Sequence, residues 1–504
     1  MRHALRAGTA GILVCTLLAF STACYDTTPP VTVPGPDVVA GPHTFVESVT
    51  LKDSRVVKFD KPGARLANGH VQGKVSGDAA DVDLALVERG VVLERTLNVW
   101  KSVGMTVAIL AGVAVVAAVI VAATKQSCPF VYSWDGARWV FDAEPYGGAV
   151  TKGLERADDV VLDHLVADAG VYRLLLTNEV LETQRTNHVS LRVVDHAPGV
   201  SIVPDEAGGL HALRAPRRPT SARLSTGRDV LPWLEATDER VFEPQPAVAP
   251  DGGTRDEIVL TFPRPRHPAA ARLVANAGTS LSGSYMIRQS LALRGRELSS
   301  WYRDLDTRAG SRSDLERWIA EEELWRLKFD VLEEDGWRTR GSLIGTGPLI
   351  VKGRVVMLDL TRAIGSEVSI RIRPPRGFWS LNAFALDDGP EPALEVRDVP
   401  LARAREADGT DRTEALRSAD DAYDTIEIGG QPVWLTFDVP PLREGLARTV
   451  LLHAQGYYTL DLPADGEPDR DRLGRVESEP GYAVHLLTER WAAYLSSRSP
   501  SSAR

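Results

Sequence analysis

A serine-rich run, Gly278-Thr279-Ser280-Leu281-Ser282-Gly283, is the part of the sequence that comes nearest to a hydrolase motif. A nucleophile elbow exposes its serine with the spacing G-x-S-x-G, because the two glycines allow a sharp turn from strand to helix. Here the two glycines stand one position too far apart for that frame. We therefore interpret the run as a polar loop.

Metal and phosphate sites have no recognisable pattern either. Four histidines lack any H-E-x-x-H or C-x-x-C partner: His164, His188, His196 and His211. The turn Gly345-Thr346-Gly347-Pro348 is followed by no lysine, and the acidic stretches at Asp420-Asp421 and Asp465 to Asp471 lack the frame of a calcium loop. We expect no metal and no cofactor, and the sequence assigns no catalytic residue.

Aromatic side chains are the remaining candidates for binding, because a ring can stack on a sugar or a peptide. In alternating strands, however, aromatic residues more often belong to the core. The ligand-binding candidates are Trp134, Trp139, Tyr146 and Trp379, with Tyr457 and Tyr458 beside them.

The first residues have the order of an export signal. Arg2, His3 and Arg6 precede an apolar run, and small residues then lead to Cys24. The run Ser21-Thr22-Ala23-Cys24 resembles a bacterial lipobox, which implies cleavage before Cys24 and lipid attachment to its thiol, although Ser21 stands where leucine is commonest. We expect a signal peptide over 1–23, lipid on Cys24 and a Pro/Thr/Val-rich tether over 24–43. An ordinary signal peptide or an uncleaved anchor is the alternative.

A second apolar segment, Val103–Thr124, carries no charge between Lys101 and Lys125. As a helix it is long enough to cross the ~30 Å hydrocarbon core of a membrane. If it crosses the inner membrane while Cys24 is lipidated outside, the rest of the chain lies in the cytoplasm. If the protein travels to the outer membrane, the segment lies in the interface, inserts as a hairpin or packs on protein. The flanking charges are too balanced to decide.

Composition sets the remaining limits. A chain of 504 residues is too long for one core, so we expect three or four units. A net charge of -10 argues against a nucleic-acid partner. Of the three cysteines, Cys15 would be removed with the signal peptide. If Cys24 carries lipid, Cys128 has no partner for a disulfide.

The fold class expected from the alternating patterns is mainly β. Short runs within 44–100 resemble the small SH3-like or Sm-like barrels that precede a hydrophobic helix, here 101–125, in bacterial envelope proteins. Asp135-Gly136, between two aromatic runs, predicts a hairpin at the start of a β-domain over 126–215. A linker and β-rich segment is expected over 216–310.

The C-terminal part is expected to hold two further β-units. Ser313-Asp314-Leu315-Glu316 resembles a capping box and predicts one short helix over 313–325. Within 311–395, the runs from Leu358 to Asn382 resemble the last strands of galactose-binding-like β-sandwiches, some of which bind glycans. A β-module over 396–495 and a disordered tail over 496–504 complete the chain.

The run Cys128-Pro129-Phe130-Val131-Tyr132-Ser133-Trp134-Asp135-Gly136 is similar to one in an uncharacterised family of bacterial envelope lipoproteins. That resemblance implies a location, the membrane of the cell envelope, but it implies no activity. The first functional hypothesis is a membrane-anchored, non-enzymatic binding or scaffold protein whose partners are membrane lipid and another envelope protein or glycan. A glycan-acting enzyme with paired carboxylates and a membrane-spanning signalling protein are the alternatives.

Overall fold

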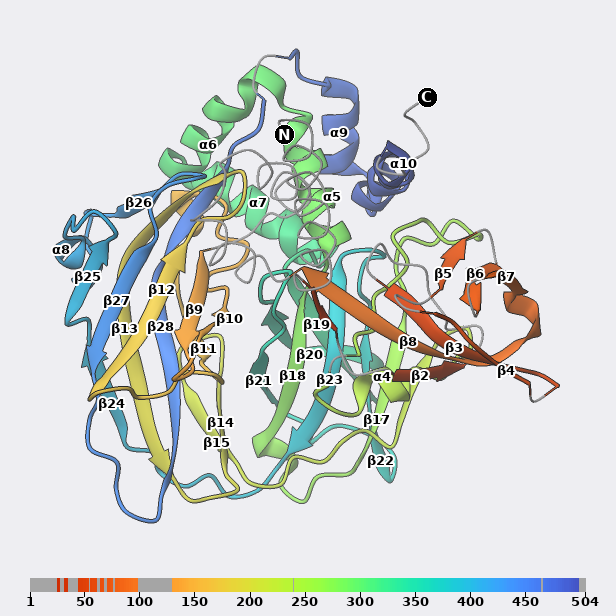
Figure 1. Cartoon of the computed structure of the whole chain (residues 1–504), viewed down its shortest axis with the longest axis horizontal. Helices are drawn as coiled ribbons and strands as arrows, with labels where there is room; N and C mark the ends of the chain where they lie inside the picture. The colour runs from red at the N-terminus through yellow and green to blue at the C-terminus, as the bar shows by residue number, and fades with distance from the viewer. Residues whose placement is uncertain are drawn as a thin grey trace, which may run out of the picture. The chain divides into compact units, whose positions relative to one another are not determined.

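The computed structural model describes residues 25–27, 31–34, 44–97 and 129–497, except for short gaps at 54, 61–63, 68–69, 76–77, 239 and 464–465. The described chain is mainly β, which confirms the expected fold class (Figure 1). It divides into two compact units, Met1–Val115 and Val116–Arg504.

The N-terminal unit consists of short strands in two small sheets. One sheet has the order β1-β8-β3-β4 with β2 also pairing β8, and the other has the order β5-β6-β7. The bounds are β1 Tyr25–Thr27, β2 Val31–Pro34, β3 Thr44–Leu51, β4 Val56–Lys58, β5 Arg65–Ala67, β6 His70–Val75, β7 Asp78–Asp83 and β8 Val87–Leu97. Val46, Val49 and Val71 form its core with Phe59. The stretch 24–43, expected to be only a tether, thus contributes two strands, because its Val and Thr residues suit pairing with the long β8.

Two five-stranded sheets form the first sandwich of the larger unit. The β9 sheet has the order β10-β9-β12-β27-β25, and the β13 sheet has the order β11-β28-β13-β24, with β26 also pairing β13. The bounds are β9 Phe130–Trp134, β10 Trp139–Ala143, β11 Arg156–Val161, β12 Val171–Thr177, β13 Glu182–His196, β24 Val396–Pro400, β25 Arg403–Glu406, β26 Asp424–Ile426, β27 Val433–Asp438 and β28 Ala447–Leu460. Leu174 from one sheet and Val189 and Leu452 from the other share one core, as strand alternation requires.

The second sandwich pairs a five-stranded sheet, of order β16-β17-β22-β19-β20, with a three-stranded sheet, of order β21-β18-β23. The bounds are β16 Ser221–Leu224, β17 Ile258–Pro263, β18 Ala271–Thr279, β19 Arg326–Glu333, β20 Gly336–Ile344, β21 Gly353–Leu358, β22 Glu367–Ile372 and β23 Trp379–Asp387. The rings of Phe329 on β19 and Phe384 on β23 meet edge to face at 6.3 Å, so the two sheets share a packed interior.

The second sandwich is an insertion within the first. It follows the hairpin of β14 (Ser201–Pro204) and β15 (Leu210–Leu213), and β24 then returns to the β13 sheet. The expected boundaries near 215, 310 and 395 therefore differ from the observed organisation. Segments 126–215 and 396–495 build one sandwich together, and strands from 216–310 pair with strands from 311–395. Local patterns could not reveal this, because the pairings join strands far apart in the sequence.

Helices gather at one end of the two sandwiches (Figure 1). They are α5 Leu281–Ala292, α6 Leu298–Thr307, α7 Ala309–Glu322, α9 Arg470–Ser478 and α10 Tyr482–Ser497. The single helix expected over 313–325 corresponds to α7, but α7 is preceded by Arg308 as N-cap, so the capping box at Ser313 is wrong. The serine run expected to be a loop instead ends β18 and begins α5, where the Ser280 side chain accepts a hydrogen bond from the Gly283 N–H.

Candidate functional site

Two of the four aromatic candidates belong to the core. Trp379 and Tyr146 are 0% exposed. The indole N–H of Trp379 donates to the Glu323 carbonyl at 2.8 Å, and the Tyr146 hydroxyl lies 2.8 Å from Thr186 Oγ1. Rings held in this way pack the interior and cannot stack on a ligand.

The other two aromatic candidates lie together on the predicted hairpin. Trp134 and Trp139 are half-buried, and their rings meet edge to face at 5.4 Å. The turn forms as its sequence predicts, since Asp135 accepts hydrogen bonds from the N–H groups of Ala137 and Arg138, and Gly136 takes φ 95. Of the four candidates, only this pair retains a surface that a ligand could reach.

The expected membrane attachments cannot be placed in the fold. The signal sequence over 1–23, Cys24 and the segment Val103–Thr124 lie outside the described residues, as do residues 498–504 of the expected tail. Within the parts of the chain that are described, no helix combines the length and the apolar character needed to cross a membrane. The lipid anchor and the spanning segment therefore remain predictions from the sequence.

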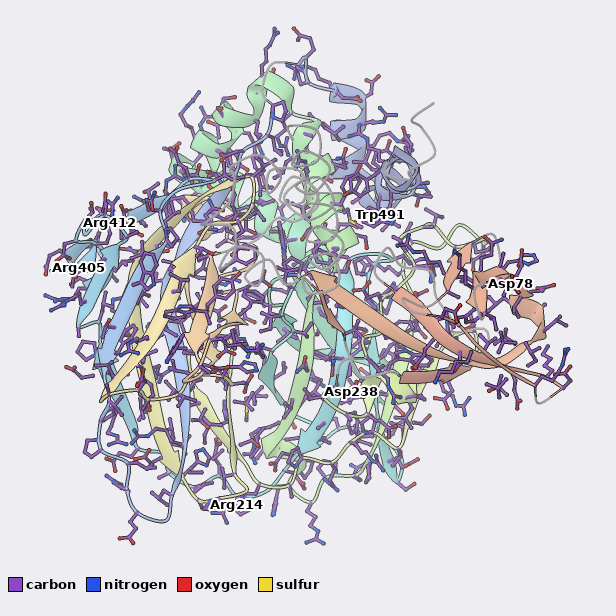
Figure 2. The ribbon with its side chains drawn as sticks, in the orientation of Figure 1. Asp78, Arg214, Asp238, Arg405, Arg412 and Trp491 are labelled. Atoms are coloured by element: carbon purple, nitrogen blue, oxygen red, sulfur yellow. The ribbon has the colours of Figure 1, made fainter. Side chains whose placement is uncertain are left out.

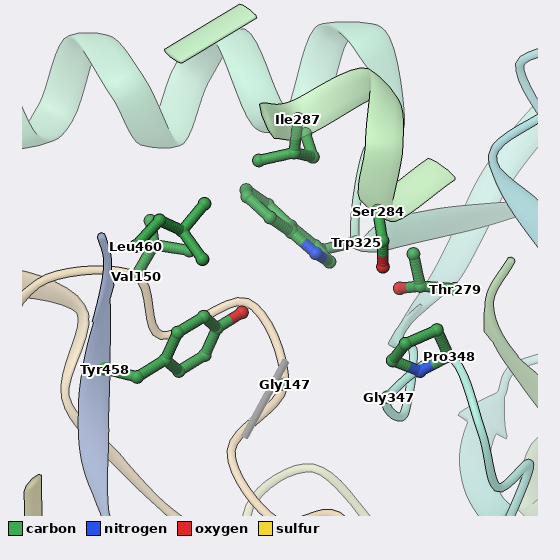
Figure 3. A pocket seen from close by; sticks show the side chains of 10 residues that line it. All are labelled: Gly147, Val150, Thr279, Ser284, Ile287, Trp325, Gly347, Pro348, Tyr458 and Leu460. Atoms are coloured by element: carbon green, nitrogen blue, oxygen red, sulfur yellow. The ribbon is translucent and has the colours of Figure 1, made fainter. Parts of the chain in front are cut away.

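A small cavity lies where the two sandwiches meet α5 (Figure 3). Tyr458 and Leu460 line it from β28, Trp325 from the position just before β19, and Ser284 from α5. Its free space suffices for about one water molecule. A sugar ring or a peptide cannot enter a space of that size, so the cavity is a packing defect at a junction and not a substrate chamber.

Two buried carboxylates lie near this cavity. Glu144 is 1% exposed and accepts hydrogen bonds from the N–H groups of Leu349 and Ile350 at 2.9 and 3.1 Å. Glu182 is 0% exposed and pairs across the sheet with Leu460, so its side chain shares the face that lines the cavity. Burial, reinforced by the charges of Glu144 and Asp461, raises the pKa of Glu182 to about 8. Glu182 is therefore a protonated, interior acid at neutral pH.

Ion pairs with buried members connect the two sandwiches. Lys352, which is 7% exposed, reaches Asp142 at 3.2 Å and also bonds Asp163. Burial opposes ionisation of Asp142, but Lys352 and hydrogen bonds from His164 hold its pKa below the usual value. Arg354 pairs with Asp158 in the same layer. These groups are engaged in holding the fold, which leaves them unavailable for chemistry.

The outer face of the β13 sheet carries a second group of polar side chains, which we call the histidine–serine cluster: Asp159, His188, Ser190, Arg192 and His453. His188 Nε2 lies 3.2 Å from Ser190 Oγ, and its Nδ1 lies 2.9 Å from the Arg417 carbonyl. His453 Nδ1 lies 3.0 Å from Asp159. The two imidazoles meet edge to face at 5.8 Å.

Strand pairing explains how the cluster assembles. Ser190 on β13 stands directly opposite His453 on β28, which in turn stands opposite Asp159 on β11. His188 stands two residues before Ser190 on β13, so strand alternation places both side chains on the same face. The short helix α8 (Thr413–Arg417) ends above His188 and supplies the Arg417 carbonyl. Arg405 and Arg412 mark this part of the chain in Figure 2.

The chain matches no protein-family model. A search of curated proteins also found no match. What the sites can do must therefore be argued from their own geometry.

The sequence alone does not predict the histidine–serine cluster, and it raises His188 only as a possible zinc ligand. In the structure the four histidines raised in that way have separate partners: Asp142 for His164, Ser190 for His188, Thr449 for His196, and Asp205 with Glu391 for His211. Within residues 44–97 and 129–497, no three His, Cys, Asp or Glu side chains are placed to hold a metal ion. The only sequence signal for the cluster is the pair of polar residues His453 and Gln455 in the run 450–455, whose other members are apolar.

Proposed function

We propose that the protein is a membrane-anchored lipoprotein of the bacterial cell envelope whose larger unit serves as a rigid binding or scaffold body. The observation that carries the proposal is the lipobox-like run before Cys24, preceded by a charged and apolar signal. The resemblance of the Cys128–Gly136 run to envelope lipoproteins supports the same cellular location.

The packing of the larger unit supports a binding or scaffold role. One continuous core runs through both sandwiches, from Val131 to Leu487, and the cavity at their junction admits about one water molecule. A body of this kind presents fixed surfaces to a partner. The paired indoles of Trp134 and Trp139 are the part of those surfaces best suited to an envelope protein or glycan as partner.

The glycan-acting enzyme is less well supported. A glycosidase needs two carboxylates on either side of a cleft that admits the sugar. Glu144 and Glu182 are both buried beside a space that holds about one water molecule, which is too small to admit a sugar.

The other alternative, a membrane-spanning signalling protein, depends wholly on whether Val103–Thr124 crosses the membrane.

The test combines fractionation with protease accessibility. In the producing bacterium, the wild type should incorporate a fatty-acid label and fractionate with membranes, and Cys24→Ala should lose the label. A C-terminal tag should be cleaved by protease added to spheroplasts. If Cys24→Ala keeps the label, the lipoprotein proposal fails. If the tag is protected until the cells are lysed, the larger unit faces the cytoplasm and the envelope-binding proposal fails.

A further inference from the structure

We propose that Ser190 is a nucleophile for acyl transfer, with His188 as its general base. The proposal goes beyond the binding or scaffold role, because a tethered body can carry a reactive site on one face, and neither depends on the other. The substrate class is a small carboxylic ester, since Ser190 is only 8% exposed and the neighbouring His453 side chain only 28% exposed, which restricts access to small molecules.

Hydrogen bonding fixes the tautomer of His188 in the form that a base requires. The Arg417 carbonyl can only accept, so the proton of neutral His188 lies on Nδ1, 2.9 Å from that oxygen. Nε2 is then the acceptor, and the Ser190 hydroxyl, 3.2 Å away, donates to it. Burial lowers the pKa of His188 by more than the Arg417 hydrogen bond raises it, and the neighbouring His453 adds to the lowering, which favours the neutral imidazole. One chain of hydrogen bonds therefore joins the nucleophile Ser190, the base His188 and the Arg417 carbonyl that orients the base.

The rest of the cluster surrounds this pair with fixed groups. His453 stands across from Ser190 and is oriented by Asp159, which is itself 2% exposed at its side chain. Arg192, two residues further along the same face, is held by Asp159 and by the Gly208 carbonyl. Ser190 is 8% exposed, His188 is half-buried and the His453 side chain is 28% exposed, so solvent reaches the row beside the two imidazoles, and a small ester would approach Ser190 from there.

The reaction balances without any co-reactant except water. Ser190 Oγ bonds to the ester carbonyl carbon while its proton passes to His188 Nε2. The bond from carbon to the alcohol oxygen breaks, and that oxygen takes the proton from His188 and leaves as the alcohol. Water then attacks the acyl group on Ser190 with His188 again taking a proton, the Ser190 ester bond breaks, and Ser190 recovers its hydrogen as the free acid departs.

The experiment uses the full chain in detergent and a fluorescent fluorophosphonate, which phosphonylates activated serines. We expect labelling of the folded wild type, with the modified peptide mapping to Ser190, and none in Ser190→Ala. His188→Gln should slow labelling by about 100-fold or more, the usual contribution of a general base. Hydrolysis of p-nitrophenyl acetate should fall in parallel in both variants.

Two matched variants keep the result interpretable. His196→Gln, at the far end of the same strand, and Ser201→Ala, on β14, should be labelled at the wild-type rate. In Ser190→Cys, iodoacetamide should alkylate the thiol faster than in the double variant with His188→Gln, which tests the base without relying on Ser190→Ala. Failure of the folded wild type to label, or labelling at another serine, would overturn the proposal and leave the scaffold role untouched.

Discussion

The junction between the two sandwiches and the outer face of the β13 sheet both collect titratable side chains, but they differ in access to solvent. At the junction, Glu182 and Asp142 are 0% exposed and Lys352 is 7% exposed. In the histidine–serine cluster, the His453 side chain is 28% exposed. The junction groups are all buried, whereas the cluster combines buried members, Ser190 at 8% and Asp159 at 3%, with an imidazole that solvent reaches. Partial solvent access, more than residue type, distinguishes the cluster from the junction.

Lys352→Met should show the largest effect on stability. The substitution keeps the apolar stem but leaves the buried Asp142 carboxylate without its cation, 3.2 Å away. Breaking one partner of a buried pair costs about 3–5 kcal/mol, which chemical denaturation should detect. The control Lys152→Met removes a cation whose partner Asp421 is 95% exposed, and it should change stability by less than ~0.5 kcal/mol. An equal loss of unfolding free energy in the two variants would show that the buried pair at the junction stabilises the fold no more than the exposed pair does.

Glu182→Gln should stabilise the protein in a pH-dependent way. The folded pKa of Glu182 is about 8, above its ordinary value of 4.5, so the stability that its neutral form provides is complete below pH 4.5 and is lost as the pH rises to 8. The amide needs no proton, and the variant should exceed the wild type by roughly 3 kcal/mol at pH 7, at about 1.4 kcal/mol per pH unit. Denaturant melts at pH 4.5 and pH 7 measure this. The same difference at both pH values would contradict it.

Gly148→Ala tests the close contact at the junction. Gly148 has φ +85, and a Cβ there would lie 2.9 Å from Trp325 Cγ. Gly170 has a similar φ of +81, but a Cβ added to it would meet nothing within 4 Å. Both alanine variants should lose ~1–2 kcal/mol of stability to left-handed backbone strain, and Gly148→Ala should lose about 2 kcal/mol more through the clash. Thermal melts that rank the two variants equally would show that the loop moves aside.

His453→Gln should have the smallest effect on stability. Its partner Asp159 keeps the bond from Arg192 at 2.9 Å, so the substitution leaves no buried charge unpaired. We expect a change in unfolding free energy below ~1 kcal/mol, measured by denaturation at pH 7. A loss of several kcal/mol would place the cluster among the groups that hold the fold.

Local chemistry was enough to predict part of this molecule. The Asp135-Gly136 hairpin forms as expected, because the turn needs only an Asx side chain and a glycine with positive φ. Alternation likewise predicted the mainly β character of the described chain. Helix α5 was missed, since its start is rich in serine and glycine, which favour loops, and tertiary packing overrides that preference.

The site depends on information that no local pattern holds. His188 reaches His453 through the pairing of β13 with β28, and Asp159 joins through β11 on the other side of β28. Only long-range register brings these residues into one row. The same limit applies to Tyr146 and Trp379, whose burial follows from how the sandwiches meet and not from their neighbours in sequence.

The insertion of one sandwich within the other sets an order of assembly during synthesis. All strands of the second sandwich lie between Ser221 and Asp387, so it can close as soon as that stretch has emerged. β12 and β13 come earlier yet must wait for β27 and β28. Until then they present unpaired edges, the kind of surface that invites aggregation. The first sandwich, begun first, is therefore finished last, and its early strands are where a chaperone would be needed.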